Sequence, residues 1–508
     1  MLPAVPPAAP PVLPVFLLRK LAAVAAALPR GGAAPFKAIT KRSISCLEDA
    51  RALKNEIIIM RLNSLSNSNT PPSEPDETLT LDRNSPISVA PDYTSLISDQ
   101  ILAIILSNLT KLQQISSCLV CKRWLRIGGG LLKSLRLLDW DFLDSGRLAL
   151  RFPNLVDVDI VQACLISPRN SGICFSNKFV SIHVNSFISN NGFIWKPDFL
   201  STRLVDRGVQ ILAQGCPNLQ RLVLLGASKN GLVSIANECL ALQELELCSC
   251  TDLDLKGLAG FRNLQILKLI GSVNALYDSV ISDIGLTILA QVCPRLLKLE
   301  LVGCEGSYDG IKAIGQCCQM LEELTLCDHK LEGGWLAALS YCTNLKTLKF
   351  QSCKFIDPNP GPNEHLGSCP TLEELHLERC QLRDKQGLGA LFLVCKAVRE
   401  LVFEDCWGLD NISFSAASIC RRVTSLSLEG CSLLTMDGFD PVVLSWKELK
   451  RLKVVSCNNI KDSAMSAELA TLFSVLKEFK WRPDSRSIMS SGLEGTGVWQ
   501  KGGRSFKI

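Results

Sequence analysis

A chain of 508 residues is too long for one compact core, so the sequence predicts either several domains or an array of repeats. Hydrophobic residues make up 47% of the chain and charged residues 20%, a balance that excludes disorder along its whole length. The formal net charge of +5 is small for this length, and basic residues do not alternate with aromatic residues in any stripe, so we expect no nucleic-acid partner.

The cysteines and the apolar runs predict where the protein works. The chain has 23 cysteines, and no segment typical of a secretory signal precedes them. We therefore expect free thiols in a reducing compartment, the cytoplasm and/or the nucleus. No apolar run approaches the roughly 18 residues that span a bilayer, so no membrane partner is expected.

Residues 1–92 are predicted to be a disordered N-terminal region and linker. Residues 1–47 contain basic but no acidic residues and many Ala and Pro, and two interpretations stay open: an organelle transit peptide or a low-complexity extension. Residues 63–92 are rich in Asn, Ser and Pro, a composition typical of a linker.

The first ordered segment is predicted at residues 93–140, as three short helices. Ser98 can cap the first helix, Asp99 lies in its first turn, and apolar residues then recur at helical spacing through Leu109. A further apolar run leads to Trp124. Because about forty residues of helix cannot bury this much apolar surface alone, part of it should face another protein or the next domain.

Residues 148–484 are predicted to form a repeat domain. The motif Leu-x-x-Leu-x-Leu is plain in residues 293–304, 369–380 and 420–431, and its first anchor recurs every 24 to 27 residues from Leu296 to Leu476. A period of roughly 20 to 29 residues is typical of leucine-rich repeats. The second and third anchors lie two apart and point inward from one strand, a helical run precedes each strand, and stacked neighbours share one core. We predict an α/β solenoid of about twelve repeats, shaped as a horseshoe.

Fifteen of the 23 cysteines recur at two fixed positions of this repeat. Three residues before the first anchor lie Cys216, Cys239, Cys293, Cys318, Cys342, Cys369, Cys395 and Cys420. Eight residues after it lie Cys250, Cys304, Cys353, Cys380, Cys406, Cys431 and Cys457. Metal ligands would not recur once per repeat along a solenoid, so we interpret both series as packing ladders and expect no metal. Cys118 and Cys121 have CxxC spacing, but packing is favoured there too over zinc or redox use.

Residues 96–127 resemble an F-box through Leu-x-x-Asp-x-Ile-Leu at the start, Ile-Leu-x-x-Leu in the middle and Leu-Val-Cys-Lys-Arg-Trp at the end. Ile97 and Thr110 stand where that family usually has Pro. The repeats resemble the cysteine-containing leucine-rich class that commonly follows an F-box. Within the predicted Gly-rich tail, residues 485–508, the segment 495–508 is similar to that of some plant F-box/LRR proteins.

The resemblance implies a small all-α F-box ahead of the solenoid and a non-catalytic role in an SCF-type ubiquitin ligase. The F-box would bind a Skp-type adaptor and through it a cullin, and the repeats would hold a protein substrate. No catalytic residue and no cofactor is then needed, and none of the four histidines lies in a metal or triad motif.

The candidate adaptor-binding residues are the apolar positions of the F-box-like segment. They are Ile101, Leu102, Ile105, Leu106, Leu109, Leu119, Val120 and Trp124. The alternative role for these side chains is the internal core of the three helices, and some residues would serve both roles.

The candidate substrate-binding residues are outward-facing strand positions. They are Lys349, Glu374, His376, Glu378, Glu400, Glu404, Glu429 and Arg451. The five glutamates lie on successive predicted strands, so we expect a negative patch that binds a basic or mixed-charge segment. The alternative is a solvated face without a partner.

Two other functions stay open. One is a leucine-rich scaffold outside ubiquitination, such as a GTPase regulator, although such repeats normally carry Asn where this chain has Cys304 or Cys380. The other is an F-box receptor in which a small molecule fills a pocket on the concave face and joins substrate to repeat. A metabolite that raised the melting temperature would identify the second.

Overall fold

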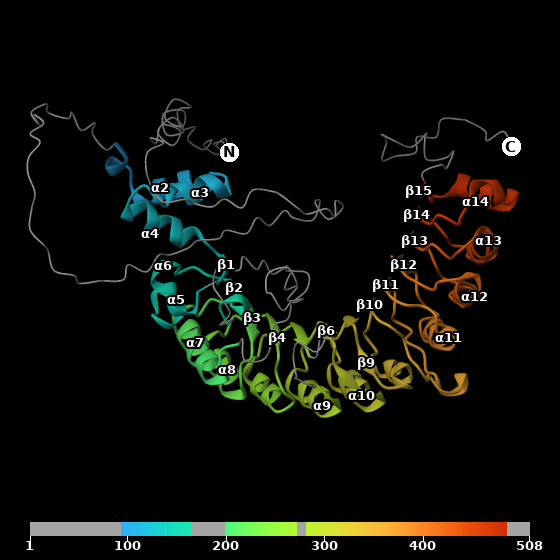
Figure 1. Cartoon of the computed structure of the whole chain (residues 1–508), viewed down its shortest axis with the longest axis horizontal. Coiled ribbons are helices and arrows are strands. Elements are labelled where there is room, and N and C mark those ends of the chain that lie inside the picture. The colour runs from blue at the N-terminus through green and yellow to red at the C-terminus, as the bar shows by residue number, and fades with distance from the viewer. Residues whose placement is uncertain (1–92, 138, 165–198, 272–280, 485–508) are drawn as a thin grey trace, which may run out of the picture. The chain divides into compact units, whose positions relative to one another are not determined.

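The computed structural model describes residues 93–137, 139–164, 199–271 and 281–484 (Figure 1). The predicted disordered region 1–92 and the tail 485–508 lie outside these ranges. The described chain divides into two compact units. A helical unit comprises residues 93–133 and 151–154, and a repeat unit comprises residues 134–150 and 155 onward.

The helical unit packs three short helices around a small apolar core. A 3-10 turn, η2 (Tyr93–Leu96), is followed by α2 (Asp99–Ser107), α3 (Lys111–Ser117) and α4 (Lys122–Leu131). Leu102, Leu106 and Trp124 form the buried core, and flanking apolar side chains such as Leu109 pack against it. As predicted, Ser98 caps α2, since its hydroxyl oxygen accepts a hydrogen bond of 3.3 Å from the Ile101 backbone N–H.

Ion pairs fasten α2 to α4 in this unit. The Asp99 carboxylate lies 2.7 Å from the guanidinium groups of both Arg123 and Arg126. The hydrogen bond from Arg123, together with the charges of both arginines, holds the pKa of Asp99 below its ordinary value. Both arginines follow closely on the apolar run after α3, so α4 presents a basic side as well as the buried Trp124.

Within the described residues, thirteen strands form one parallel sheet in chain order. They are β1 (Ser134–Arg136), β2 (Asp157–Asp159), β3 (Arg221–Leu225), β4 (Glu244–Cys248), β5 (Ile266–Ile270), β6 (Lys298–Val302), β8 (Glu323–Cys327), β10 (Thr347–Gln351), β11 (Glu374–Glu378), β12 (Glu400–Glu404), β13 (Ser425–Glu429), β14 (Arg451–Val455) and β15 (Glu478–Arg482). A second, two-stranded pairing joins β7 (Glu305–Gly306) to β9 (Lys330–Leu331).

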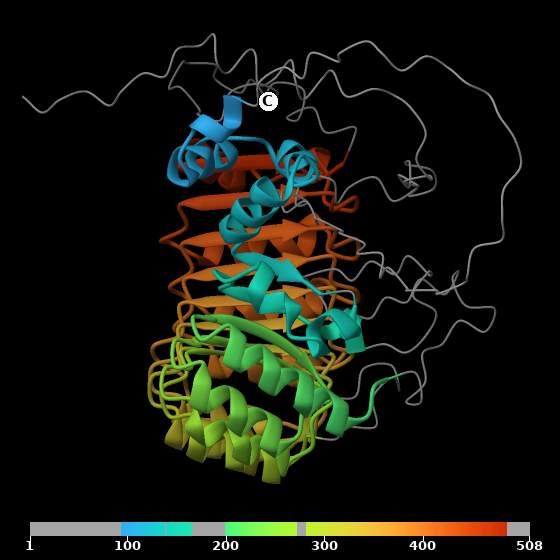
Figure 2. The same cartoon turned by 90° about the vertical axis from the view of Figure 1, so that its left-hand side faces the viewer.

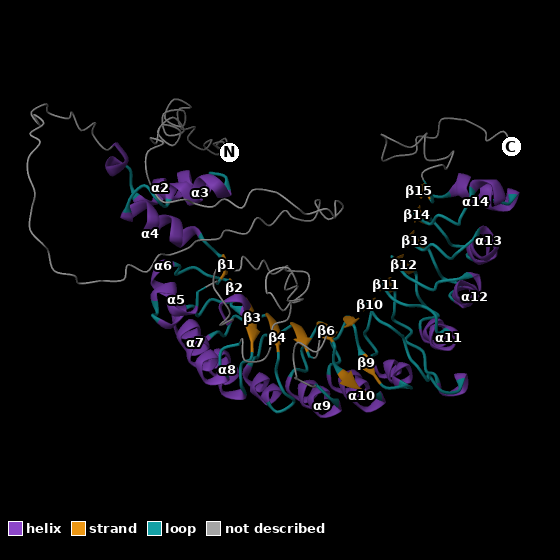
Figure 3. Ribbon diagram, viewed as in Figure 1, coloured by secondary structure: helices purple, strands orange, loops and turns teal. Residues whose placement is uncertain are grey.

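Helices follow the outside of the repeat unit, and the strands line its inner, concave face (Figures 2 and 3). The α-helices are α5 (Trp140–Asp144), α6 (Arg147–Arg151), α7 (Thr202–Gly215), α8 (Lys229–Glu238), α9 (Asp283–Val292), α10 (Tyr308–Cys317), α11 (Lys385–Val394), α12 (Asn411–Ser415), α13 (Met436–Ser445) and α14 (Ala467–Val475). The 3-10 helices are η3 (Val161–Cys164), η5 (Asp254–Gly260), η6 (Trp335–Tyr341), η7 (Asn363–His365), η8 (Ala416–Ile419) and η9 (Asp462–Ala464). This is the predicted leucine-rich-repeat solenoid.

The predicted alternation is clear in β11, where Leu375 and Leu377 are buried, whereas the first, third and fifth residues face the concave side. In β3, β4 and β8 the outward-facing third and fifth residues are buried as well. The sheet already begins at Ser134, although the sequence placed the first repeat at residue 148. The reason is that β1 is three residues long and carries no complete Leu-x-x-Leu-x-Leu motif.

A left-handed backbone turn ends nine of the strands. The residue after the strand has a φ between 41° and 69°, as in Asp405 (51°) and Gly430 (69°). Gly and Asp tolerate this conformation better than most residues. The turn directs the chain away from the sheet toward the convex side, so the carboxyl ends of the strands form one continuous edge.

Thiols of the cysteine ladders donate hydrogen bonds to carbonyls of the preceding repeat. The Cys318 thiol donates to the Cys293 carbonyl (3.4 Å), and the Cys406 thiol donates to the Leu377 carbonyl (3.2 Å). The cysteines of both ladders are buried, and every cysteine within the described ranges is free. Burial raises the pKa of Cys342 to about 12, which keeps its thiol protonated and unreactive. The packing interpretation of the ladders is confirmed.

Candidate functional site

The eight candidate adaptor-binding residues divide into buried and exposed groups. Leu102, Ile105, Leu106 and Trp124 are buried, and Leu109 packs partly against the same core. Ile101, Leu119 and Val120 are exposed, with 74% of Leu119 accessible to solvent. The buried residues therefore hold the helices together, and the exposed ones remain available to a partner.

Sequence reasoning missed two exposed apolar side chains of the same unit. Ile104 on α2 is 58% exposed, and Leu96 at the end of η2 is 83% exposed. Ile101 and Ile104 lie three apart and so share one side of α2. The signal was present in the sequence, because α2 is apolar on more than one side and so short a unit cannot cover all of it. We call Leu96, Ile101, Ile104, Leu119 and Val120 the exposed apolar set.

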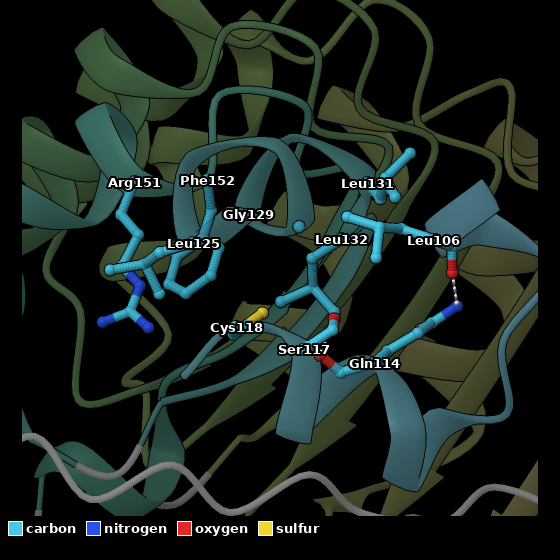
Figure 4. Close-up of a pocket in the computed structure, with 11 residues that line it drawn as sticks. Leu106, Gln114, Ser117, Cys118, Leu125, Gly129, Leu131, Leu132, Arg151 and Phe152 are labelled. Carbon is cyan, nitrogen blue, oxygen red and sulfur yellow. Dashed lines mark hydrogen bonds between the residues drawn. The ribbon is translucent and has the colours of Figure 1, made fainter. Parts of the chain in front are cut away.

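A small cavity lies inside the helical unit (Figure 4). Leu106, Leu125 and Phe152 contribute apolar walls, and Gln114 donates to the Leu106 carbonyl (3.1 Å) at its rim. Its volume is about 40 Å³. Pockets that hold drug-sized molecules measure roughly 300 to 1,000 Å³, so this cavity is too small for such a ligand.

Cross-strand ion pairs neutralise the concave face between β2 and β10. Arg221 lies 2.9 Å from both Asp157 and Glu244, one on each neighbouring strand. Lys268 pairs with Glu300 (2.8 Å), and Glu323 accepts both Lys298 and Lys349 at 3.0 Å. Lys349, a candidate substrate-binding residue, therefore already has an ion-pair partner, Glu323 of β8. Such pairs on adjacent strands stabilise the sheet and leave little net charge.

Glu246 is a buried carboxyl group in this part of the face. Burial, only partly offset by Lys268 and Arg221, raises its pKa to about 7, well above the ordinary value of 4.5. Arg221 is 3.6 Å away. The folded state therefore holds a proton on Glu246 between about pH 4.5 and 7 that the unfolded state releases.

Stability is consequently expected to fall as the pH rises through this window. A Glu246→Gln variant, which cannot ionise, should be more stable than the wild type by about 3 kcal/mol at pH 8, and by little below pH 5. Urea unfolding of both proteins at the two pH values measures the difference. An equal difference at both values would contradict the raised pKa.

The structure brings the five candidate glutamates together on three adjacent strands. Glu374 and Glu400 are in register on β11 and β12. Glu378, Glu404 and Glu429 are in register on β11, β12 and β13. We call these five residues the glutamate cluster. The strand pattern predicts this placement on successive strands, and the structure shows it.

Cations partly neutralise the glutamate cluster. Arg451 reaches Glu400 (2.7 Å), Lys453 reaches Glu429 (2.6 Å), and Arg379 pairs with Glu378. Glu374 accepts a hydrogen bond from the Thr347 hydroxyl (3.3 Å), and Glu404 lies 3.8 Å from the His376 imidazole. The cluster is therefore less negative than five unpaired carboxylates would be. Arg451, a candidate substrate-binding residue, is part of this pairing.

Trp407 lies at the same edge and was missed. It is 63% exposed and follows Glu404 by three residues, at the carboxyl end of β12. Its backbone N–H donates to Cys380 (2.8 Å) and its carbonyl accepts from Leu382 (2.6 Å), so the neighbouring repeat fixes its position. The signal lay in the repeat register, since the other residues directly after this cysteine ladder are polar. Exposed Trp is typical of protein-binding surfaces.

The fold and the repeat register define a leucine-rich-repeat protein. No family model matches the chain. Human F-box/LRR-repeat protein 12 is 28% identical over 221 residues, which cover 37% of this chain and 66% of the relative. The mouse protein of that name is 27% identical with the same coverage. Bovine F-box/LRR-repeat protein 4 is 26% identical over 195 residues, which cover 37% of this chain and 31% of the relative.

The chain thus spans just under two thirds of the first relative and under a third of the last. The plant-like subfamily stays a prediction. Among solved structures, an internalin (inlF) from Listeria monocytogenes aligns with a TM-score of 0.35 at 16% identity, over 66% of this chain and 83% of its own. The TLR13 chain of a TLR13–ssRNA13 complex aligns with a TM-score of 0.34 at 18% identity, over 61% and 38%. In the described residues, no helix has the length and apolar character needed to cross a bilayer.

Proposed function

We propose that this chain is the substrate-recognition subunit of an SCF-type ubiquitin ligase. The helical unit would act as an F-box that binds a Skp-type adaptor and, through it, a cullin. The observation that carries this proposal is the exposed apolar set, five large side chains open to solvent on a unit of about forty residues. The names of the sequence relatives support it.

The proposed mechanism is proximity. A substrate held on the repeat unit has its lysines at high effective concentration beside the ubiquitin thioester of the conjugating enzyme. The chain itself then needs no catalytic group and no cofactor, and the reaction chemistry stays with the other subunits. The free thiols are suited to the reducing cytoplasm and/or nucleus, where we propose that the protein acts.

We place the substrate on the concave face between β11 and β13. The glutamate cluster favours a segment that carries Lys or Arg, because Glu374 and Glu404 have no lysine or arginine partner within the described ranges. Trp407 at the edge of these strands offers an aromatic surface over which such a cation can lie. This surface would therefore bind a basic or mixed-charge segment that places at least one Lys or Arg near the carboxyl ends of these strands.

Affinity purification followed by mass spectrometry tests the function. The full chain is expected to recover a Skp-type adaptor, a cullin and further proteins, whereas a Leu119→Asp/Val120→Asp variant should recover only the further proteins. If both forms recover the same partners without adaptor or cullin, the chain is a leucine-rich scaffold outside ubiquitination. Recovery of the further proteins only in the presence of an added metabolite extract would indicate the small-molecule receptor.

Charge reversal tests the substrate surface. Replacing Glu374 and Glu400 with Lys is expected to lower recovery of the basic substrate about tenfold or more, because two attractive contacts become repulsive. Adaptor recovery should not change. Glu238→Lys at the exposed end of α8 is the control, because it makes one such charge reversal on the convex side, where no substrate contact is expected. Unchanged substrate recovery in the double variant would reject this surface.

A further inference from the structure

One histidine and two glutamates of the concave face come together at the ends of β11 and β12. His376 and Glu378 are the third and fifth residues of β11, so both side chains point to the concave side. Glu404 is the fifth residue of β12 and is in register with Glu378. One nitrogen or oxygen atom from each of the three side chains lies within 4.8 Å of the other two.

The His376 Nε2 atom is unsatisfied in this arrangement. It is buried from solvent and makes no hydrogen bond to any residue that the structure describes, although the Glu404 carboxylate lies 3.8 Å away. Val402 is the neighbour of His376 in β12 and is buried, and Lys349, its neighbour in β10, is paired with Glu323 (3.0 Å). A histidine nitrogen without a hydrogen-bond partner is available to bind a metal ion.

The two carboxylates are available to the same ligand. Glu404 has no ion-pair partner other than His376 among the described residues. Glu378 accepts hydrogen bonds from the Gln351 amide (2.8 Å) and from Arg379. An ionised carboxylate has about four lone-pair sites, so two donors leave room for a metal bond. Hydrogen-bond donors that contact a metal-binding carboxylate in this way fix its orientation toward the metal.

We propose that His376, Glu378 and Glu404 bind a zinc ion. Imidazole and carboxylate together suit zinc, whereas calcium and magnesium prefer oxygen ligands alone. Bonds of about 2.0 to 2.1 Å in a tetrahedral site separate the ligand atoms by roughly 3.4 Å, and the three atoms now lie within 4.8 Å of one another. Side-chain movements that shorten these separations by up to about 1.4 Å therefore form the site. The fourth position opens on the concave face and takes a water molecule.

This site goes beyond the proposed function, and its existence does not depend on it. What does rest on the proposed function is a second role for the fourth position, which a donor side chain of a bound substrate could occupy in place of water. Zinc would also cancel the charge of Glu378 and Glu404 and leave Glu374 as the negative end of the glutamate cluster.

Metal titration of the purified full chain tests the site. Zinc chloride alone is titrated by calorimetry into a Cys118→Ser/Cys121→Ser background, because Cys121 is exposed and Cys118 only half-buried. One zinc ion per chain is expected. His376→Ala and Glu404→Gln should each weaken binding at least about tenfold, whereas Glu374→Gln on the same face should not.

Cobalt substitution separates this site from the cysteines. Cobalt bound by His376 and two carboxylates is expected to give only weak visible bands, whereas thiolate ligands add an intense sulfur-to-cobalt charge-transfer band. Circular dichroism confirms that each variant is folded. Zinc binding that persists in both His376→Ala and Glu404→Gln, or a strong thiolate band at one equivalent of cobalt, would overturn the proposal. Neither result would bear on adaptor recovery, so the proposed function is tested separately.

Discussion

Replacing Leu119 with Asp is expected to weaken binding of a Skp-type adaptor about 100-fold or more. Leu119 is 74% exposed in the connection between α3 and α4, so it contributes nothing to the core that Leu102 and Trp124 form. Removing a buried apolar contact from an interface and placing a carboxylate there costs about 3 kcal/mol or more, which corresponds to this factor. Calorimetric titration of the purified full chain with the adaptor measures the change.

The matched control for this variant is Leu240→Asp. Leu240 is 66% exposed and lies between α8 and β4 on the repeat unit, so the same chemical change occurs away from the exposed apolar set. It should leave adaptor affinity unchanged. The melting temperatures of both variants should match the wild type, because neither side chain is buried. Equal adaptor affinities for Leu119→Asp and the wild type would remove this surface from the proposal.

Replacing Trp481 with Ala is expected to lower the stability of the C-terminal repeats by about 3 to 5 kcal/mol. Trp481 is fully buried in β15, the last strand of the sheet. Its ring lies 4.9 Å from the ring of Phe473 and 5.7 Å from that of Phe439, measured between centroids, and its Nε1–H donates to the Asp462 carboxylate (2.8 Å). Chemical unfolding with limited proteolysis measures the loss.

The proteolysis should be local to the C-terminal repeats. Each repeat of a solenoid contacts only its neighbours, so new cleavage sites are expected after β13 and not near β3. Trp407→Ala is the control, since it removes the same ring from an exposed position and should change stability by less than about 1 kcal/mol. A comparable loss of stability in both variants would show that the burial of Trp481 does not stabilise the C-terminal repeats.

The strand register could be predicted from the sequence because two regular spacings determine it. The Leu-x-x-Leu-x-Leu spacing fixes which residues of a strand point inward, and the repeat length fixes which strands are neighbours. These two spacings are enough to place Glu378 and Glu404 on one face and on adjacent strands, as the sheet has them. The strand β1 was not predicted, because it is too short to repeat the motif.

The charge of the glutamate cluster could not be predicted in the same way. Arg451 neutralises Glu400 from two strands away, across Ser425 of β13, whose short side chain lets the two longer ones meet. That contact depends on side-chain rotamers and on the identity of the residue between them. The register alone says only that all three positions share a row.

Which side of α2 is buried could not be predicted from the sequence either. Helical spacing identified Ile101, Leu102, Ile105 and Leu106 as apolar, but not which of them would be covered. The answer depends on where α3 and α4 pack, and their position is set by residues such as Arg123, which reaches back to Asp99. The apolar character of α2 indicates that some of its large side chains stay exposed, but the packing of the other helices decides that Ile104 is one of them.

Direct titration of the purified full chain with a purified Skp-type adaptor tests whether the helical unit is an F-box. We expect a stable one-to-one complex that recruits cullin in a size-exclusion experiment and that the Leu119→Asp/Val120→Asp variant fails to form. A full chain that is folded by circular dichroism, yet does not bind the adaptor at micromolar concentrations, would contradict it.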